Sequence, residues 1–170
     1  AREEQAKQAW EEIRFLEENA FYYPARDLLF YHADIKGNYL KSQRMEAVRA
    51  LLELPETVVV TTVDAFLDGV KPLQEIVRER IVLESGKPVD FTLLQKNLAD
   101  LGYVREEQVE GPGQFAVRGG LLDVFPLTGE VPVRIELWGD EIDSVRSFEV
   151  ESQRSIENLE SIVIYPAEET

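Results

Sequence analysis

The sequence contains no cysteine and a single histidine, His32. Without cysteine the chain has neither disulfides nor thiolate metal sites, which fits a reducing cytoplasm. One histidine argues against a zinc site and against a histidine-based catalytic triad, so we expect His32 to be a packed or surface residue. No apolar run reaches the length of a membrane span, and no charged-then-apolar leader opens the chain. We therefore expect a cytoplasmic chain with no membrane partner.

Basic residues are scarce: 18 lysines and arginines stand against 33 acidic residues, a net charge of −15. The imbalance is uneven. From Ile81 onward there are 7 basic and 18 acidic residues, a net of −11, whereas 11 and 15 precede it, a net of −4. Such a surface repels the phosphate backbone of DNA. The charge argues against a nucleic-acid module and does not by itself point to another partner.

Motifs for phosphate chemistry and catalysis are also missing. No segment matches G-x-x-x-x-G-K-[ST], so the chain holds no P-loop. The Gly-Pro-Gly of residues 111–113 precedes a strand and lacks a third glycine, which favours a turn over a nucleotide loop. Asp140, Glu141 and Asp143 could bind a hard cation, but carboxylates beside a glycine are more often a solvated turn. Since no nucleophile, base and oxyanion site come together, we predict no catalysis, no metal and no cofactor in this chain.

Helical and strand patterns alternate through residues 1–80. Residues 3–18 and 44–54 carry apolar residues at helical spacing. Residues 21–23 and 57–61 are short strand-like segments, and the second is β-branched throughout, as expected of a strand covered on both faces. The order helix, strand, helix, strand is typical of a parallel α/β sheet. We predict a partial parallel α/β domain here.

The pattern changes around residues 69–80, where we place a domain boundary. Beyond it, Asp90 can cap a helix that Gly102 ends in the C′ position. From Tyr103 the apolar period shifts to two, with glycine and proline as punctuation, which indicates an antiparallel sheet. We predict that residues 81–170 form an α+β module, an antiparallel sheet plus a helix.

Two later segments refine this sheet. Residues 133–138 alternate as a strand, with Arg134, Glu136 and Trp138 on one side. Residues 142–150 lose strict alternation, which predicts a β-bulge. Residues 162–165 could close the sheet or return to the first domain.

One hairpin can be worked out residue by residue. If Gly119 and Gly120 form a two-residue turn, one face of the hairpin is wholly apolar. That face consists of Phe115, Val117, Leu122 and Val124. The other face carries Arg118, Asp123 and Phe125, and an exposed phenylalanine beside an arginine is typical of a protein-binding hot spot. The alternative, which the sequence leaves open, is that Phe125 packs under a loop and Arg118 pairs with Asp123.

Two long segments carry a resemblance to a known family. Residues 113–126 (GQFAVRGGLLDVFP) and 132–146 (PVRIELWGDEIDSVR) resemble the UvrB-homology module of nucleotide-excision-repair proteins. Within that group, four shorter segments are similar to bacterial transcription-repair coupling factors more than to UvrB itself: residues 23–27, 42–44, 151–156 and 164–169. The resemblance covers nearly the whole chain.

The resemblance implies both a fold and a function. In coupling factors the first part is a piece of a degenerate helicase-like domain, and the acidic β-rich part is inserted in it and binds UvrA. The full protein pushes stalled RNA polymerase off DNA with an ATP-driven motor. The resemblance puts that motor, its ATP and Mg, and the contacts with RNA polymerase and DNA outside this chain.

The UvrA-contacting positions that the resemblance implies are Arg105, Arg118 and Phe125. Ala116 departs from the pattern, because UvrB tends to carry a further arginine there, so we expect one charged contact fewer. A second hypothesis is a fragment of a UvrB-type enzyme that hydrolyses ATP and loads damaged DNA. The two hypotheses differ in whether a P-loop lysine lies upstream of Ala1.

The charge generates a first prediction. We expect weak or no binding of the chain to double-stranded DNA at physiological salt, because its net charge of −15 opposes the phosphate charge. Fluorescence anisotropy of a labelled duplex measures this. A micromolar or tighter complex that weakens with added salt would show instead that a basic patch dominates.

Overall fold

The computed structural model describes residues 2–26 and 35–168, so the prediction for His32 lies outside the described residues. The chain divides into two compact units, the first ending at Val77 and the second comprising Arg78–Glu168. Sequence patterns alone place this boundary at residue 80. The first unit contains α1 (Glu3–Ile13), β1 (Ala20–Tyr23), α2 (Ile35–Glu53), β2 (Val58–Thr61) and α3 (Val63–Leu67), and α4 (Leu73–Glu79) spans the boundary. The second contains β3 (Ile81–Glu84), α5 (Phe91–Asp100), β4 (Val104–Arg105), β5 (Gln114–Arg118), β6 (Leu121–Phe125), β7 (Val133–Trp138), β8 (Glu141–Phe148), β9 (Ser155–Leu159) and β10 (Ser161–Ile164).

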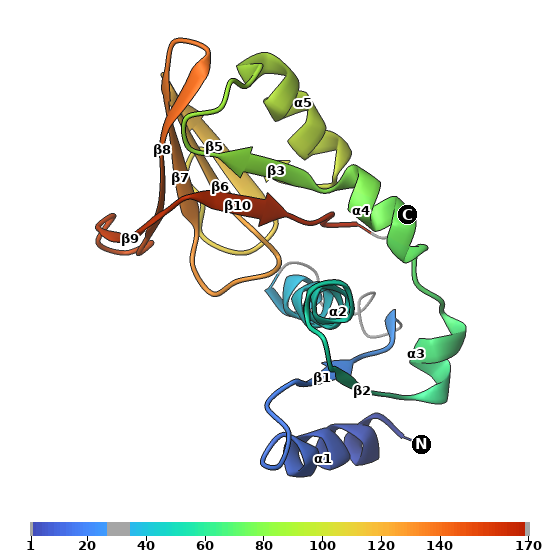
Figure 1. Cartoon of the computed structure of the whole chain (residues 1–170). Helices are drawn as coiled ribbons and strands as arrows, with labels where there is room; N and C mark the ends of the chain where they lie inside the picture. The colour runs from blue at the N-terminus through green and yellow to red at the C-terminus, as the bar shows by residue number, and fades with distance from the viewer. Residues whose placement is uncertain (1, 27–34, 169–170) are drawn as a thin grey trace. The chain divides into compact units, whose positions relative to one another are not determined.

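In the first unit, β1 and β2 pair in parallel, with Ala20 opposite Val58 and Tyr23 opposite Thr61. This confirms the predicted parallel pairing, and α2 makes the crossover between the strands. Figure 1 shows α1 and α2 on opposite sides of the strand pair. The coverage predicted for β2 is wrong, because Val58 is exposed and the rest of the strand is half-buried.

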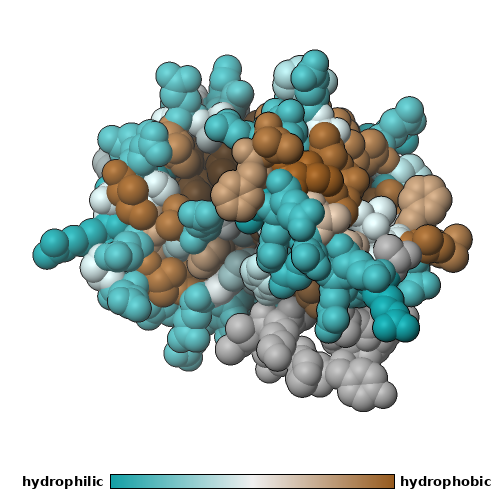
Figure 2. Space-filling view, turned by 90° about the horizontal axis from the view of Figure 1, so that it is seen from below, coloured by the Kyte–Doolittle hydropathy of each residue, from teal (hydrophilic) through white to brown (hydrophobic). Residues whose placement is uncertain are grey.

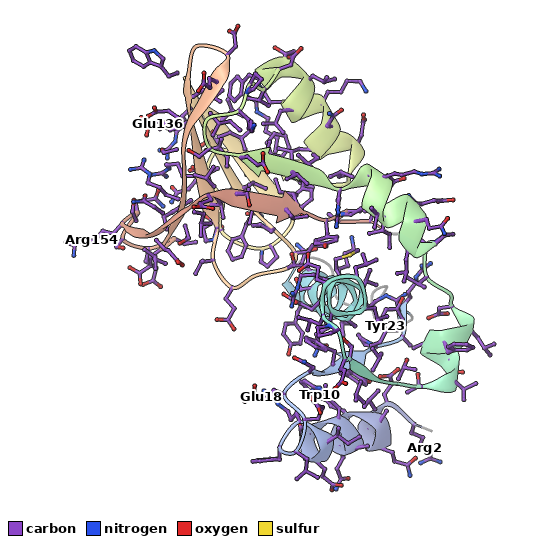
Figure 3. The ribbon with its side chains drawn as sticks, in the orientation of Figure 1. Arg2, Trp10, Glu18, Tyr23, Glu136 and Arg154 are labelled. Atoms are coloured by element: carbon purple, nitrogen blue, oxygen red, sulfur yellow. The ribbon has the colours of Figure 1, made fainter. Side chains whose placement is uncertain are left out.

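Polar contacts tie α1 to the strands. The indole Nε1 of Trp10 donates to the carbonyl of Ala20 at 2.9 Å, and its ring stacks on Tyr22 with 5.9 Å between centroids. The Glu3 carboxylate accepts from the Tyr22 hydroxyl and, at 3.2 Å, from the Thr62 hydroxyl. Figure 3 shows Trp10 between α1 and the strand pair. These bonds fix the helix on the sheet from its first turn to its last.

The first helix ends at Ile13, earlier than the apolar spacing predicted, and Leu16 lies beyond it in exposed chain. Apolar side chains reach the surface among polar ones, as Figure 2 shows for one face of the molecule. In the first unit the largest exposed examples are Phe15, Leu16, Phe66 and Leu67. Two short strands offer too little area to cover them. No helix within residues 2–26 and 35–168 combines the length and apolar character that crossing a membrane requires.

The second unit is built on a six-stranded sheet in the order β4-β5-β6-β7-β8-β9. Neighbouring strands from β5 to β9 are antiparallel, whereas β4 lies parallel to β5. β10 pairs with β3 in a separate two-stranded sheet, so residues 162–165 do not close the larger sheet. The predicted bulge is confirmed by a register shift between Ser147 and Phe148, and a second shift follows Glu136.

The predicted helix and its ends are confirmed. The Asp90 side chain accepts from the Leu93 amide at 3.0 Å and caps α5, and Gly102 follows the helix with φ 93°. α5 buries Leu94 and Leu98. The sheet face that we call the covered face is lined by Phe115, Leu122, Val124, Ile135 and Val145, all buried. The sheet and helix therefore form the α+β module that the sequence predicts.

Tyr103 joins three parts of the second unit from within the core. Its hydroxyl donates to the carbonyl of Tyr165 at 2.8 Å, just beyond β10, and accepts from the Leu127 amide at 3.3 Å. Burial raises the pKa of this hydroxyl above its usual value. The neutral form is thus the one that the folded unit holds.

The Tyr103→Phe substitution should lower the free energy of unfolding by about 1–3 kcal/mol, because buried partners lose their hydrogen bonds to the hydroxyl. The wild type should also lose stability above about pH 10, where the unfolded tyrosine ionises and the folded one stays protonated. The variant should lose less over that range. Urea unfolding at pH 8 and pH 10.5 measures both effects, and an equal loss in the two proteins would contradict the role of Tyr103.

Candidate functional site

The hairpin of β5 and β6 positions Arg118 as the sequence predicts. Arg118 lies opposite Leu121, Val117 opposite Leu122, and Phe115 opposite Val124. Gly119 has φ 58° while Gly120 does not have a positive φ, the pattern of a type II′ turn. The predicted register is therefore confirmed residue by residue.

Opposite the covered face lies a second side of the sheet, which we call the open face. Cross-strand pairs extend the hairpin pattern onto β7 and β8: Asp123 lies opposite Arg134, and Arg134 opposite Arg146. The next row holds Arg118, Leu121, Glu136 and Ser144. Figure 3 shows Glu136 projecting from the sheet on the side away from α5. The open face thus gathers three of the seven basic residues that follow Arg80.

The prediction that Phe125 is exposed on this face is wrong. Phe125 shares the face with Arg118, yet only 7% of it is accessible. It packs in a small cluster with Val109, Ala116 and Phe148, against which Val150 also lies. Near Phe125 both faces of the sheet are apolar and buried. The hairpin register was therefore predicted correctly, although the exposure of the Phe125 ring was not.

A side-chain hydrogen bond explains the cover over Phe125. The amide oxygen of Gln114, which lies opposite Phe125, accepts from the backbone amides of Glu110 at 2.8 Å and Gly111 at 3.1 Å. This holds the loop that carries Val109 against the sheet. The alternative in which Phe125 packs under a loop is the one observed.

A buried carboxylate organises the centre of the open face. The Asp123 side chain is 4% exposed, and its two oxygens accept hydrogen bonds from Arg134 at 2.7 and 2.9 Å in a bidentate ion pair. Arg134 also donates to Gln153 at 2.8 Å, and its guanidinium lies 4.4 Å from the centre of the Phe148 ring. The hydrogen bond to Asp123 raises the pKa of Arg134, so this cation stays charged.

Arg118 is the outermost member of this network. Its guanidinium donates a long hydrogen bond of 3.5 Å to Asp123, and 55% of its side chain remains exposed. Because Arg134 already neutralises Asp123, the charge of Arg118 is left largely available to a partner. The pairing of Arg118 with Asp123, which the sequence left open as an alternative, is therefore observed. It is weaker than the contact of Asp123 with Arg134.

Arg105 does not join Arg118. It lies opposite Phe115, so its side chain belongs to the covered face, where it donates to Gln95 of α5 at 3.2 Å. Its strand, β4, is the edge of the sheet. The structure thus divides the three predicted residues: Arg118 on the open face, Arg105 at the edge on the other face, and Phe125 inside.

Sequence reasoning missed the open-face residues outside the hairpin. Arg146 binds Glu136 at 3.1 Å beside the Asp123–Arg134 pair. The alternation of residues 133–138 had already put Arg134 and Glu136 on one side. What it lacked was the pairing of β6 with β7, which joins that side to the face of Arg118. No group of three or more histidine, cysteine, aspartate or glutamate residues in the described part of the chain could hold a metal ion.

Comparison with known proteins identifies the second unit. Residues 81–169 match the family model described as the UvrB interaction domain. The chain belongs to this family. The UvrB interaction domain therefore includes the open face, β4 and α5. This confirms the resemblance to the excision-repair module found in residues 113–146.

Relatives extend the similarity into the first unit. The transcription-repair-coupling factor of Bacillus subtilis (strain 168) is 37% identical over 147 residues, which are 86% of this chain and 12% of that protein. That of Staphylococcus aureus (strain Mu50) is 33% identical over 156 residues, 91% of this chain and 13% of that protein. The chain spans about an eighth of the length of these relatives. The chain is thus similar to a region of coupling factors, proteins of transcription-coupled DNA repair.

The burial of Phe125 generates the third prediction. The Phe125→Ala substitution should lower the free energy of unfolding by about 3–5 kcal/mol, because it empties a buried site. The matched Arg118→Ala substitution on the same face should change it by no more than about 0.5 kcal/mol, since that side chain is largely exposed. Urea unfolding monitored by circular dichroism compares the two. Equal midpoints for Phe125→Ala and the wild type would contradict the cluster.

Proposed function

We propose that the UvrB interaction domain of this chain docks UvrA, and that it does so through its open face. The observation that carries the proposal is the largely exposed Arg118, held beside a neutralised Asp123 on a domain of this family. A guanidinium that a weak contact with Asp123 already orients, and that is still largely exposed, can bind a partner carboxylate with little further loss of side-chain entropy. Arginine is also a residue type enriched at binding hot spots.

The three proposed site residues have different roles in this docking. Arg118 contacts UvrA directly. Arg105 contacts it from the exposed edge of the sheet, around β4. Phe125 supports the face from below, since little of its ring can reach a partner. The overall acidity of the domain favours a basic rim on the UvrA surface that surrounds these contacts.

The proposed place of the chain in a longer protein follows from its relatives. We propose that it is the N-terminal part of a transcription-repair coupling factor, which brings UvrA to stalled RNA polymerase, and that the first unit is a piece of a degenerate helicase-like domain. The ATP-driven motor and the contacts with RNA polymerase and DNA belong to other parts of that protein. The chain itself acts in the cytoplasm as a binding module, without catalysis, metal or cofactor. The coupling-factor names of the relatives support this over a UvrB-type loading enzyme.

Titration of UvrA tests the docking. Arg118→Ala should weaken binding by about 1–3 kcal/mol, as hot-spot residues do. Arg105→Glu should weaken it more than Arg105→Ala, because the reversed charge adds repulsion to the lost contact. The control is Lys96→Ala, which removes an exposed cation of α5 that pairs with Asp100 in the same helix. Isothermal calorimetry measures the affinities, and absence of binding by the wild-type chain would overturn the function.

A further inference from the structure

The burial of Phe125 leaves the open face without its predicted aromatic residue, and the structure supplies another. Trp138, the last residue of β7, is 82% exposed. It follows Glu136 by two residues, and the register shift after Glu136 skips Asp143 of β8 while β7 runs on without an extra residue. The Trp138 side chain therefore lies on the same face as Glu136, one pleat further along the strand. Glu136 itself belongs to the row of Arg118 and Leu121.

A backbone hydrogen bond brings Trp138 next to the Arg118 hairpin. The amide of Leu137 donates to the carbonyl of Gly120 at 3.0 Å, so the end of β7 runs beside the β5–β6 turn. With strands about 4.8 Å apart and about 3.4 Å per residue, Arg118 and Trp138 lie about 12 Å apart on the backbone. A single helix or strand of a partner can span that distance.

The surface between the two residues is formed by small or half-buried residues and by a carboxylate that is ion-paired. Both turn residues are glycines, and a Cβ at Gly119 would meet no atom within 4 Å. Leu121 lies between the strands of Arg118 and Glu136 and is half-buried. Glu136, the acidic residue in the row of Arg118 and Leu121, is engaged by Arg146 at 3.1 Å, and a further carboxylate, Glu141, lies opposite Trp138. A partner can therefore approach both Arg118 and Trp138 without displacing a side chain that lies between them.

Charge distribution separates this surface from the rest of the domain. On the open face, three arginines (Arg118, Arg134 and Arg146) stand against three carboxylates, those of Asp123, Glu136 and Glu141. The remaining part of residues 81–170 carries four basic residues, namely Lys87, Lys96, Arg105 and Arg154, against a large excess of acidic ones. A centre without net charge that offers a cation and an aromatic ring, surrounded by acidic residues, fits a partner surface of complementary charge. That partner presents a carboxylate beside an apolar side chain, surrounded by basic residues.

A lone exposed apolar residue needs no explanation. Trp138 is not alone, because Leu121 and the aliphatic part of Arg118 lie on the same face beside it. Tryptophan and arginine are the residue types most enriched among hot spots, which lie at the centre of interfaces. We propose that Trp138, Leu121 and Arg118 form the contact centre of the docking surface, with Trp138 as its aromatic anchor. The inference rests on the proposed function, since UvrA is the partner that this surface would bind.

Binding of purified UvrA to Trp138 variants tests the inference. Trp138→Ala should weaken binding by about 10- to 100-fold, as the loss of a hot-spot aromatic does. Trp138→Phe should weaken it less, because part of the apolar contact remains. The melting temperature of both variants should equal that of the wild type, since the side chain packs against little. The matched control is Leu93→Ala, an exposed apolar residue on α5, which should leave binding within about twofold.

A spectroscopic readout distinguishes contact from an indirect effect. The chain has two tryptophans, Trp10 and Trp138, so labelling with 5-fluorotryptophan gives two fluorine resonances, which Trp138→Phe assigns. On addition of unlabelled UvrA, the Trp138 resonance should lose its solvent isotope shift, whereas that of Trp10 should keep its value. Wild-type binding with Trp138→Ala equally tight, or with Trp138 still open to solvent, would overturn this inference and leave UvrA docking intact. No binding by the wild type would instead overturn the docking itself.

Discussion

The buried carboxylate of Asp123 is the constraint on which the open face depends. A charge removed from water is tolerated only when opposite charge and hydrogen bonds replace the lost hydration. Arg134 provides both, and Gln153 and the Phe148 ring hold Arg134 in turn. One buried group therefore links β6, β7, β8 and the turn before β9. Because that demand is already met, Arg118 can remain mostly in solvent beside it.

The same arrangement explains why the two ends of the open face differ. Near Phe125 the face is closed by the loop that Gln114 holds in place, and apolar residues form a second small core there. Near the Gly119–Gly120 turn, Arg118 and Trp138 stay exposed. Asp123 and Arg134 lie between these two ends. The covered face of the sheet thus belongs to the core, whereas the open face is exposed at the end near the Gly119–Gly120 turn.

Local chemistry made much of this fold predictable from the sequence. The cap at Asp90, the helix end at Gly102 and the β5–β6 register each depend on residues within about a dozen positions of one another. The burial of Phe125 depends on Val109 and Phe148, which come from a loop and a distant strand. Alternation tells which residues share a face, but not what covers that face. The error at Phe125 and the omission of Trp138 both follow from that limit.

The position of Arg105 adds a geometric requirement to the docking surface. Arg105 and Arg118 belong to opposite faces of one sheet, so a flat partner surface cannot contact both. β4 is only two residues long and forms the sheet edge, which puts Arg105 where a partner could reach around from the open face. Its contact with Gln95 at 3.2 Å is a single hydrogen bond in solvent, which costs little to exchange. A partner that binds all of these residues must therefore be concave along the β4 edge, and one that contacts only Arg118 and Trp138 need not be.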